Sequence, residues 1–331
     1  MRVAFCVCYW LNDKYPSRNF NIRNNVAIRD GLDIINQIYV LYKSIKLHIH
    51  NVDYDFYVFT KNKYLTKDIK NIFNHLNIKI IILEDDIIEK YFRPKIYTYD
   101  IVCDYKCVMD CDIIFVNDFS IEDIEYMQNY DCLGMYGHRN IDYQTYMRIC
   151  NKLNLKIPTE IEETKYYKSN NKSWTVLNTY QYNLNITSSE HINDNIKYKN
   201  YIKDTKRLFP YFNNGMILIK NTLSKELGNL WLIKRKELHE NFSWLSLGDA
   251  GEASIGLCIN HITNKWNGLP KGSNIVCSKC TCYSSNNITK DFVIKSIHNQ
   301  HITTDMNIYK RCIEHIIFNN KYCANVWDIE C

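Results

Sequence analysis

The first 83 residues alternate between short apolar runs and segments with helical spacing, and this alternation limits the possible folds most strongly. Apolar runs of strand type cover Val3–Tyr9, Phe56–Thr60 and Ile78–Leu83. Between them, apolar residues recur at helical spacing over Ile34–Leu47 and again over Leu65–Leu76. Strands that alternate with helices predict an α/β fold with a largely parallel sheet that helices cover on both faces.

The rest of the sequence fits one domain with an insertion. A strand broken by two carboxylates is predicted within Tyr105–Ser120, and the sequence then becomes polar and rich in Asn, Lys and Tyr. Core-like sequence returns at Phe209–Lys220, where a turn-like Asn-Asn-Gly enters a strand, and a last strand is predicted over Phe292–Ile297. Helices are predicted over 223–238 and 249–261. We therefore expect a single domain over 1–331, with a nucleotide-binding half (1–139), a polar insertion (140–207), an acceptor and metal-site half (208–300) and a C-terminal tail (301–331).

Composition and charge exclude several classes of protein. Hydrophobic residues make up 46% and charged residues 23%, as in ordinary soluble globular proteins. No apolar run reaches the eighteen residues of a membrane span, and the first residues lack the features of a secretory signal. The net charge of +5 is mild and no Lys/Arg tract with interleaved aromatics occurs, so nucleic acid is not an expected partner. We expect a cytoplasmic protein.

The 14 cysteines are spread from Cys6 to Cys331 and form no compact framework, which favours reduced thiols. One short cluster, Cys277, Cys280 and Cys282, could contribute to a zinc site if a distant cysteine completed it. A second pair with zinc-ligand spacing is absent from the sequence, so free thiols are the favoured interpretation and zinc remains open.

Asp110 and Asp112 form the strongest functional signal. The apolar segment Cys107–Met109 runs directly into this Asp-Cys-Asp motif, which places both acids at the carboxyl end of a strand. Ligands of open α/β sheets bind at that edge, and two such carboxylates can hold Mn²⁺ or Mg²⁺ against phosphate oxygens. The same pattern at Asp53 and Asp55 precedes its strand and is interpreted as a solvated turn. An exposed turn is the structural alternative for the first pair as well.

The segment YDIVCDYKCVMDCDIIFVNDFS resembles the metal-binding stretch of the GT-A glycosyltransferases, especially glycosyltransferase family eight, the glycogenin and bacterial galactosyltransferase group. PYFNNGMILIKN looks like that family's aromatic–Asn–small–Gly segment, and His298 after FVIKSI is similar to its late metal-binding histidine. The resemblance implies a GT-A-like nucleotide-diphospho-sugar transferase fold, with a mixed, mostly parallel central sheet flanked by helices. These pieces cover about 1–140 and 205–300.

Carried over to this sequence, the resemblance implies three groups of site residues. The metal ligands would be Asp110, Asp112 and His298. The nucleotide, diphosphate and donor sugar would meet Cys8, Tyr9, Asn12, Arg93, Lys95, Asn214 and Gly215. The residues near the reacting sugar would be Asn213, Asp249 and Glu252.

Two features of the sequence depart from the resemblance or weaken it. The family continues after its histidine with Gly and then Lys-Pro-Trp, whereas this chain reads HNQHITTDMN, so a diphosphate-binding lysine has no counterpart there. Asp249 and Glu252 also have a structural interpretation, because D-x-x-E before an apolar run resembles a capping box that begins a helix. Both roles can hold together, since a helix N-terminus also favours anions.

The sequence therefore predicts an Mn²⁺- or Mg²⁺-dependent hexosyltransferase that uses a UDP-sugar and a glycan or protein hydroxyl acceptor, with retention implied by the resemblance. Three alternatives stay open. One is a non-catalytic protein of the same fold that binds nucleotide sugars or glycans. Another is an inverting GT-A enzyme with Glu252 as base. The third is a metal-dependent phosphohydrolase or nucleotidyltransferase, which Ile113 and Ile114 after the second acid disfavour.

Overall fold

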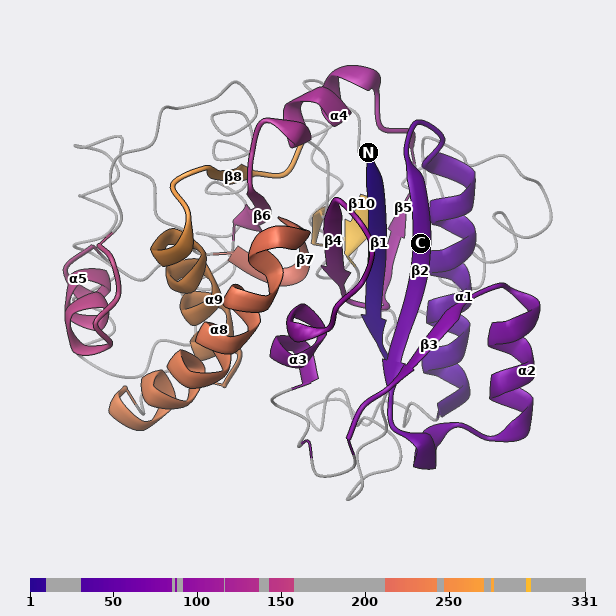
Figure 1. The fold of residues 1–331 in the computed structure, drawn as a ribbon, viewed down its shortest axis with the longest axis horizontal. Helices are drawn as coiled ribbons and strands as arrows, with labels where there is room; N and C mark the ends of the chain where they lie inside the picture. The colour runs from indigo at the N-terminus through magenta and orange to yellow at the C-terminus, as the bar shows by residue number, and fades with distance from the viewer. Residues whose placement is uncertain are drawn as a thin grey trace, which may run out of the picture.

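The computed structural model describes residues 1–9, 31–84, 87, 92–115, 117–136, 143–157, 212–242, 247–270, 275–276 and 296–298. Its centre is a seven-stranded sheet with the strand order β3-β2-β1-β4-β7-β6-β8 (Figure 1). These strands are β1 (Arg2–Cys8), β2 (Asp53–Thr60), β3 (Lys79–Ile82), β4 (Tyr105–Met109), β6 (Cys132–Tyr136), β7 (Phe212–Lys220) and β8 (Trp266–Gly268). A smaller sheet has the order β5-β10-β9 and consists of β5 (Ile113–Phe115), β10 (Ser296–His298) and β9 (Ile275–Val276).

The central sheet is mixed and mostly parallel. The pairs β1–β2, β1–β4, β2–β3 and β6–β8 are parallel, whereas β7 runs antiparallel to both β4 and β6. The described helices are α1 (Gly31–His48), η1 (Asn62–Tyr64), α2 (Lys67–His75), α3 (Phe92–Thr98), α4 (Ile121–Gln128), α5 (Tyr143–Lys152), α8 (Asn221–Asn241) and α9 (Leu247–Ile262). The predicted class, an α/β fold with a mixed, mostly parallel sheet flanked by helices, is confirmed.

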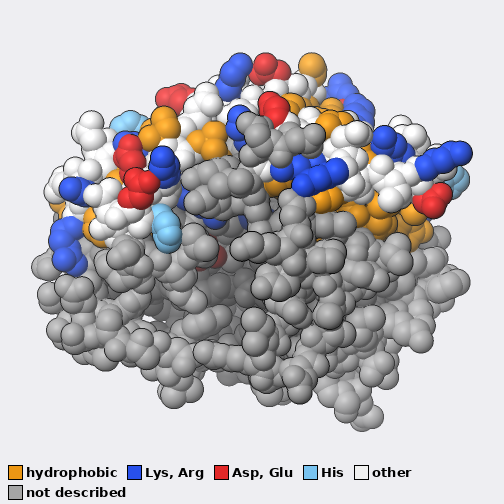
Figure 2. All heavy atoms as spheres, turned by 90° about the horizontal axis from the view of Figure 1, so that it is seen from below, with side chains coloured by type: hydrophobic (Ala, Val, Ile, Leu, Met, Phe, Trp, Pro, Cys, Tyr) orange, Lys and Arg blue, Asp and Glu red, His pale blue; other side chains and the backbone are white. Residues whose placement is uncertain are grey.

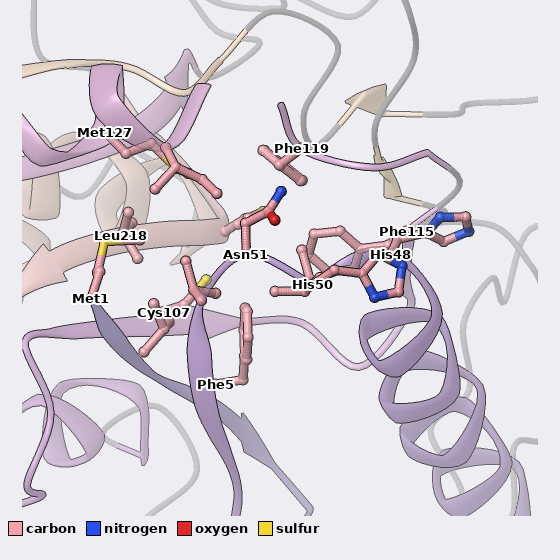
Figure 3. Close-up of a pocket in the computed structure, with 15 residues that line it drawn as sticks. Met1, Phe5, His48, His50, Asn51, Cys107, Phe115, Phe119, Met127 and Leu218 are labelled. Atoms are coloured by element: carbon pink, nitrogen blue, oxygen red, sulfur yellow. The ribbon is translucent and has the colours of Figure 1, made fainter. Parts of the chain in front are cut away.

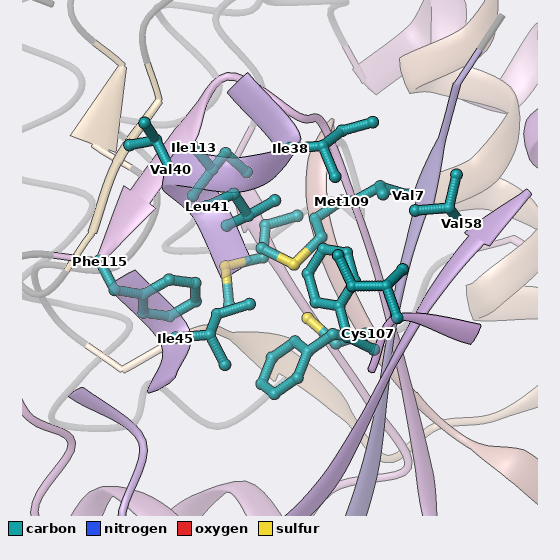
Figure 4. Packing of buried hydrophobic residues seen from close by; sticks show 14 of the residues in the cluster. Val7, Ile38, Val40, Leu41, Ile45, Val58, Cys107, Met109, Ile113 and Phe115 are labelled. Carbon is teal, nitrogen blue, oxygen red and sulfur yellow. The ribbon is translucent and has the colours of Figure 1, made fainter. Parts of the chain in front are cut away.

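One face of the sheet packs against α1, α2 and α4. Alternate side chains of β1 and β4, including Val7, Cys107 and Met109, point to this face because successive residues of a strand face opposite sides. Ile38 and Leu41 of α1 meet them in a buried cluster, which Figure 4 shows from close by. The periodicity over 34–47 thus marks the face that α1 turns to the sheet.

The other face packs against α3, α8 and α9, on the opposite side of the sheet from α1 and α2 in Figure 1. Helices α3 and α8 approach each other closely at Gly228. A Cβ atom on this glycine would lie 2.7 Å from the Pro94 carbonyl oxygen and 2.9 Å from Tyr97 Cβ. The absence of a side chain at Gly228 therefore sets how near α3 can come to α8.

A buried lysine holds the C-terminal end of α3. Lys106 of β4 is 1% exposed, and its Nζ atom donates to the carbonyl oxygens of Ile96 at 3.5 Å, Tyr97 at 3.0 Å and Tyr99. The Ser224 hydroxyl of α8 also donates to the Tyr97 carbonyl, at 2.7 Å. The last carbonyls of a helix have no partners within it, so Lys106 and Ser224 supply the donors that fix α3 to the sheet and to α8.

Several local predictions differ from the structure. Asn213, Asn214 and Gly215 lie inside β7 and not in a turn before it, and Asn213 pairs with Met135 of β6. The pairing of β6 with β7 then shifts register, because Gly134 pairs with Ile217, so Asn214, Gly215 and Met216 form a bulge opposite β6. A further strand that was not predicted from the sequence, β8, pairs with β6.

The second acid pair also differs in detail. Asp53 and Asp55 belong to the first residues of β2, at the amino edge as predicted, but they are strand residues and not a turn. Asp55 accepts bonds from Arg2 at 2.6 Å and Lys79 at 2.8 Å. This ion-pair network lies at the edge opposite to Asp110.

The described part of the chain leaves some predictions without a structural answer. Most of the predicted insertion, 158–207, the tail 301–331 and the cluster of Cys277, Cys280 and Cys282 lie outside the described residues. Among the described residues, eight cysteines are free thiols. None of the described helices combines the length and the apolar character that a membrane crossing needs.

Candidate functional site

The two acids Asp110 and Asp112 follow β4 directly, at the carboxyl edge of the sheet. The Asp110 N–H donates to the Gly215 carbonyl oxygen at 2.8 Å, which ties the end of β4 to the beginning of β7. The Asp110 side chain is 39% exposed and Asp112 is half-buried. Both carboxylates are therefore placed where ligands of open α/β sheets bind.

Cys111, between the two acids, anchors the turn to α1. Its Sγ atom lies 3.2 Å from Oε1 of Gln37, a residue that is itself buried. Cys111 also packs against the apolar cluster beneath the turn. The middle residue of the motif thus holds the turn in place on α1.

Arg93 connects the acids to the Asn-Asn-Gly segment. From the first turn of α3, its guanidinium forms an ion pair with Asp110 Oδ1 and donates to the Asn214 carbonyl oxygen. Its side chain is only 19% exposed. Burial lowers the pKa of Arg93, but the negative charges of Asp110 and Asp112 outweigh it, and the pKa lies above its ordinary value. The guanidinium therefore stays charged beside both acids.

Asn213 and Glu252 hold each other in a fixed orientation. Asn213 is 1% exposed, its Oδ1 accepts from the Gly215 N–H at 2.7 Å, and its Nδ2 donates to Glu252 Oε1 at 3.1 Å. Glu252 lies in the second turn of α9. The bond joins α9 to β7, so the predicted sugar pocket and the predicted acid belong to one site.

Gly251 leaves room for a second arginine next to this pair. A Cβ atom on Gly251 would lie 3.0 Å from Asn214 Nδ2 and 3.6 Å from Arg235 Nη2. The Arg235 guanidinium, from α8, also lies 5.6 Å from the centre of the Trp231 ring. The Asn214 Oδ1 atom is buried, with no hydrogen-bond partner in the described part of the chain. The sequence analysis did not identify Arg235, because α8 reads as an ordinary amphipathic helix.

His298 is placed by its backbone. It lies in β10, which pairs antiparallel with β5, and its partner is Ile113, the residue after Asp112. Paired residues of an antiparallel ladder have Cα atoms about 5 Å apart. The backbone of the predicted third ligand is therefore next to the two acids, as the resemblance implies, and the ligand role of His298 stays a prediction.

The remaining predicted residues lie around this centre or outside the described residues. Cys8 is half-buried at the end of β1, and Tyr9 is buried edge-on to Phe73 at a centroid distance of 6.2 Å. Lys95 is half-buried in α3, two residues beyond Arg93. Asp249 lies in the first turn of α9, and Asn12 lies outside the described residues.

The donor set at this edge fits a hard divalent cation held together with a phosphorylated ligand. Asp110 and Asp112 supply carboxylate oxygens, the type of ligand that Mg²⁺ and Mn²⁺ prefer. Among the described side chains, no cluster of three or more His, Cys, Asp or Glu could hold a metal. Cations that are bound by two carboxylates usually complete their coordination with water and substrate phosphates, so two acids at an open edge suit this mode.

Figure 2 shows the molecule from the side to which β1 points in Figure 1, which is the carboxyl edge of the sheet. The coloured Lys and Arg side chains on this face lie interspersed with Asp and Glu. Charged side chains that a substrate could meet therefore carry both signs in the described part of this face.

An apolar cavity lies elsewhere, between the sheet, the end of α1 and α4 (Figure 3). Its volume is about 40 Å³, and Met1, Phe5, Cys107, Met127 and Leu218 are among the residues that line it. Phe5, Cys107 and Leu218 belong to the face of the sheet that α1 and α4 cover, and Met127 reaches the cavity from α4. The cavity contains none of the acids or arginines described above, so it is separate from the candidate site.

The chain was compared with known proteins. No protein-family model matches it, and no curated protein sequence matches it either. Solved structures that match this chain include the galactosyltransferase LgtC in complex with donor and acceptor sugar analogues, with a TM-score of 0.47, 10% identity and coverage of 96% of this chain and 95% of that chain. Mouse xyloside xylosyltransferase 1 in its apo form gives a TM-score of 0.47 and 10% identity, covering 92% of this chain and 99% of that chain. At this level of similarity, neither structure assigns a role to any residue of this chain.

Proposed function

We propose that the chain is a metal-dependent glycosyltransferase of the GT-A type, which transfers a hexosyl unit from a UDP-sugar to a hydroxyl of a glycan or protein. The observation that carries the proposal is the pair of bonds made by Arg93. They join Asp110 to the Asn214 carbonyl oxygen, and so unite the two segments that the sequence singled out. We further propose that the transfer retains the anomeric configuration, as the sequence resemblance implies.

The charges of the site suit a diphosphate. Two carboxylates alone repel phosphate oxygens, so an anionic ligand at Asp110 and Asp112 requires a cation between them. A divalent ion bound there would act as a Lewis acid on the departing diphosphate. Arg93 adds a rigid guanidinium fork at the same place, and such forks match phosphate geometry.

The neighbouring residues would position the sugar. Asn213 is buried and bonded on both sides, so it is pre-organised and holds both the Glu252 carboxylate and the backbone N–H of Gly215 in place. Glu252, held by Asn213, is the carboxylate that we expect to face the acceptor hydroxyl or the transferring sugar. An inverting reaction would require Glu252 to act as base, and the anomer of the product decides between the two outcomes.

A thermal-shift screen of nucleotide sugars with and without Mn²⁺ tests the proposal. A ligand that binds only the native state raises the melting temperature by mass action. We expect stabilisation by UDP or a UDP-sugar that requires Mn²⁺ and disappears in the double variant Asp110→Asn/Asp112→Asn. The conservative amides keep the size of the side chains and remove the charge. Equal stabilisation of both proteins would contradict the proposal.

The competing assignment is a protein of the same fold that binds nucleotide sugars without turning them over. It agrees with the missing Lys-Pro-Trp segment after His298. Donor hydrolysis in the presence of Mn²⁺ separates the two assignments, because a transferase releases UDP slowly even when water is the acceptor. Tight binding with no UDP release over hours, for every donor that stabilises the protein, would favour the binding protein.

A further inference from the structure

Arg93 occupies the position of a counter-ion in the candidate metal site. Its guanidinium bonds Asp110 Oδ1 directly, and the charge of Asp112 acts on it as well. The two carboxylates together carry a charge of −2, and Arg93 neutralises half of it. A divalent cation that approaches this site without a nucleotide therefore meets a weaker negative field and a nearby positive charge.

The structure also shows that Arg93 is held firmly in this role. Its second nitrogen donates to the Asn214 carbonyl, and Lys106, Ser224 and Gly228 fix α3, which carries it. Only 19% of the Arg93 side chain is exposed, so water screens the pair incompletely. A cation that binds Asp110 must displace Arg93 from it. This displacement costs free energy, unless another anion becomes the new partner of the guanidinium.

We propose that Arg93 is an internal counter-ion that keeps the metal affinity of the nucleotide-free site low and couples metal binding to the binding of a nucleoside diphosphate. The inference rests on the proposed function. When Asp110 binds the metal and releases Arg93, the diphosphate supplies the negative charge that pairs with the Arg93 guanidinium. Because coupling between two ligands is reciprocal, the metal strengthens nucleotide binding by the same factor as the nucleotide strengthens metal binding.

Titration calorimetry with Mn²⁺, in the absence and in the presence of UDP, tests this inference on the full-length wild type and three variants. The variant Arg93→Met removes the charge, and Arg93→Lys keeps the charge but loses the fork. Lys236→Met is the matched control, since it removes one positive charge from a lysine of α8 that is 65% exposed. Thermal unfolding of each protein establishes that it is folded.

For the wild type we expect UDP to tighten Mn²⁺ binding about tenfold or more, within the usual range of coupling between sites. Arg93→Met should bind Mn²⁺ alone about tenfold more tightly than the wild type. The factor by which UDP increases the Mn²⁺ affinity should be smaller in this variant by the same amount. Arg93→Lys and Lys236→Met should bind Mn²⁺ alone as the wild type does. Electron paramagnetic resonance, which measures the concentration of free Mn²⁺, determines the same affinities without relying on the heat of binding.

The outcomes separate the inference from the proposed function. If the wild type binds neither Mn²⁺ nor UDP, the proposed function fails. If Mn²⁺ binds the wild type equally well with and without UDP, the proposed function fails too, because it requires UDP binding that depends on Mn²⁺. If the wild type shows this coupling and a folded Arg93→Met variant shows it undiminished, the inference alone is wrong. Unchanged or weaker Mn²⁺ affinity of a folded Arg93→Met variant would also overturn it. Arg93→Gln, which also removes the charge, takes the place of Arg93→Met if that variant does not fold.

Discussion

Replacing Lys106 by methionine should destabilise the protein and loosen the helix that carries Arg93. The Lys106 ammonium donates to three carbonyl oxygens at the end of α3. Without it, the Tyr97 carbonyl keeps the Ser224 hydroxyl as a donor and the Ile96 carbonyl keeps the Tyr99 N–H at 3.4 Å. Hydrogen bonds from a charged group contribute about 1.5–3 kcal/mol each, and the desolvation of the buried ammonium offsets part of this. We expect Lys106→Met to lose about 2–3 kcal/mol of unfolding free energy.

Urea unfolding measures this loss as a lower midpoint at an unchanged m-value. Lys225→Met is the control, because Lys225 is 63% exposed and pairs with Asp100 at 3.5 Å, so its loss should cost less than about 0.5 kcal/mol. Calorimetry should also show weaker Mn²⁺-dependent UDP binding by Lys106→Met, at a temperature where the variant is folded. A loss of stability equal to that of the control would refute the role given to Lys106.

The pH dependence of the same variant gives a second test. Burial lowers the pKa of Lys106 in the native state below its ordinary value of 10.5. Between these two pKa values the unfolded chain binds more protons than the native protein, so the contribution of Lys106 to stability rises with pH. The difference in unfolding free energy between wild type and Lys106→Met should therefore grow as the pH approaches 10.5. A difference that shrinks over this range would contradict the assignment.

Three further predictions concern other parts of the fold. Gly228→Ala should lose about 1–3 kcal/mol, since its Cβ would lie 2.7 Å from the Pro94 carbonyl oxygen and would push α3 from α8, and an unchanged urea midpoint would contradict this. Glu252→Gln should lower kcat at least tenfold in a donor-transfer assay while Mn²⁺-dependent UDP binding stays within twofold, and an equal loss of both would make Glu252 a binding residue. Burial raises the pKa of the Cys107 thiol, so the native state retains its proton above the ordinary thiol pKa and stability should fall by about 1.4 kcal/mol per pH unit there. Cys107→Ala should reduce this slope, and an identical slope in both proteins would contradict the explanation.

Much of the architecture follows from apolar periodicity in the sequence. The strand predicted over 3–9 is β1. The helix predicted over 34–47 is α1, which begins three residues earlier and ends one residue later. These elements bury whole faces, so their patterns are strong. The position of Asp110 at the carboxyl edge followed from the apolar strand that precedes it.

Elements that depend on distant partners escaped the sequence analysis. Helix α3 has only seven residues and contains Pro94, and its end is held by Lys106 and Ser224, which no local pattern shows. Asn213–Gly215 resembled a turn, because Asn and Gly favour turns, but the pairing of Asn213 with Met135 and the bond from the Asp110 N–H to the Gly215 carbonyl oxygen hold the segment in β7. Tertiary contacts override local preference at these places.

The structure brings together several residues that the sequence singled out, Arg93 with Asp110 and Asn213 with Glu252, and their roles stay predictions. Arg93 was expected to meet the diphosphate or the donor sugar, and the structure places it on Asp110 and on the Asn214 carbonyl. Lys106 could have been noticed as a single lysine inside the apolar strand Tyr105–Met109, a position that requires buried acceptors. Arg235 carries no such signal, because in the sequence it stands between Lys234 and Lys236 and reads as one of several charged residues of a helix.

The most direct test of the central claim is a crystal structure of the protein grown with Mn²⁺ and UDP, with the anomalous signal of manganese used to locate the ion. The account predicts one manganese within about 2.3 Å of carboxylate oxygens of both Asp110 and Asp112 and of the UDP pyrophosphate. Manganese bound at another place, or UDP bound with both acids directed into solvent, would contradict it.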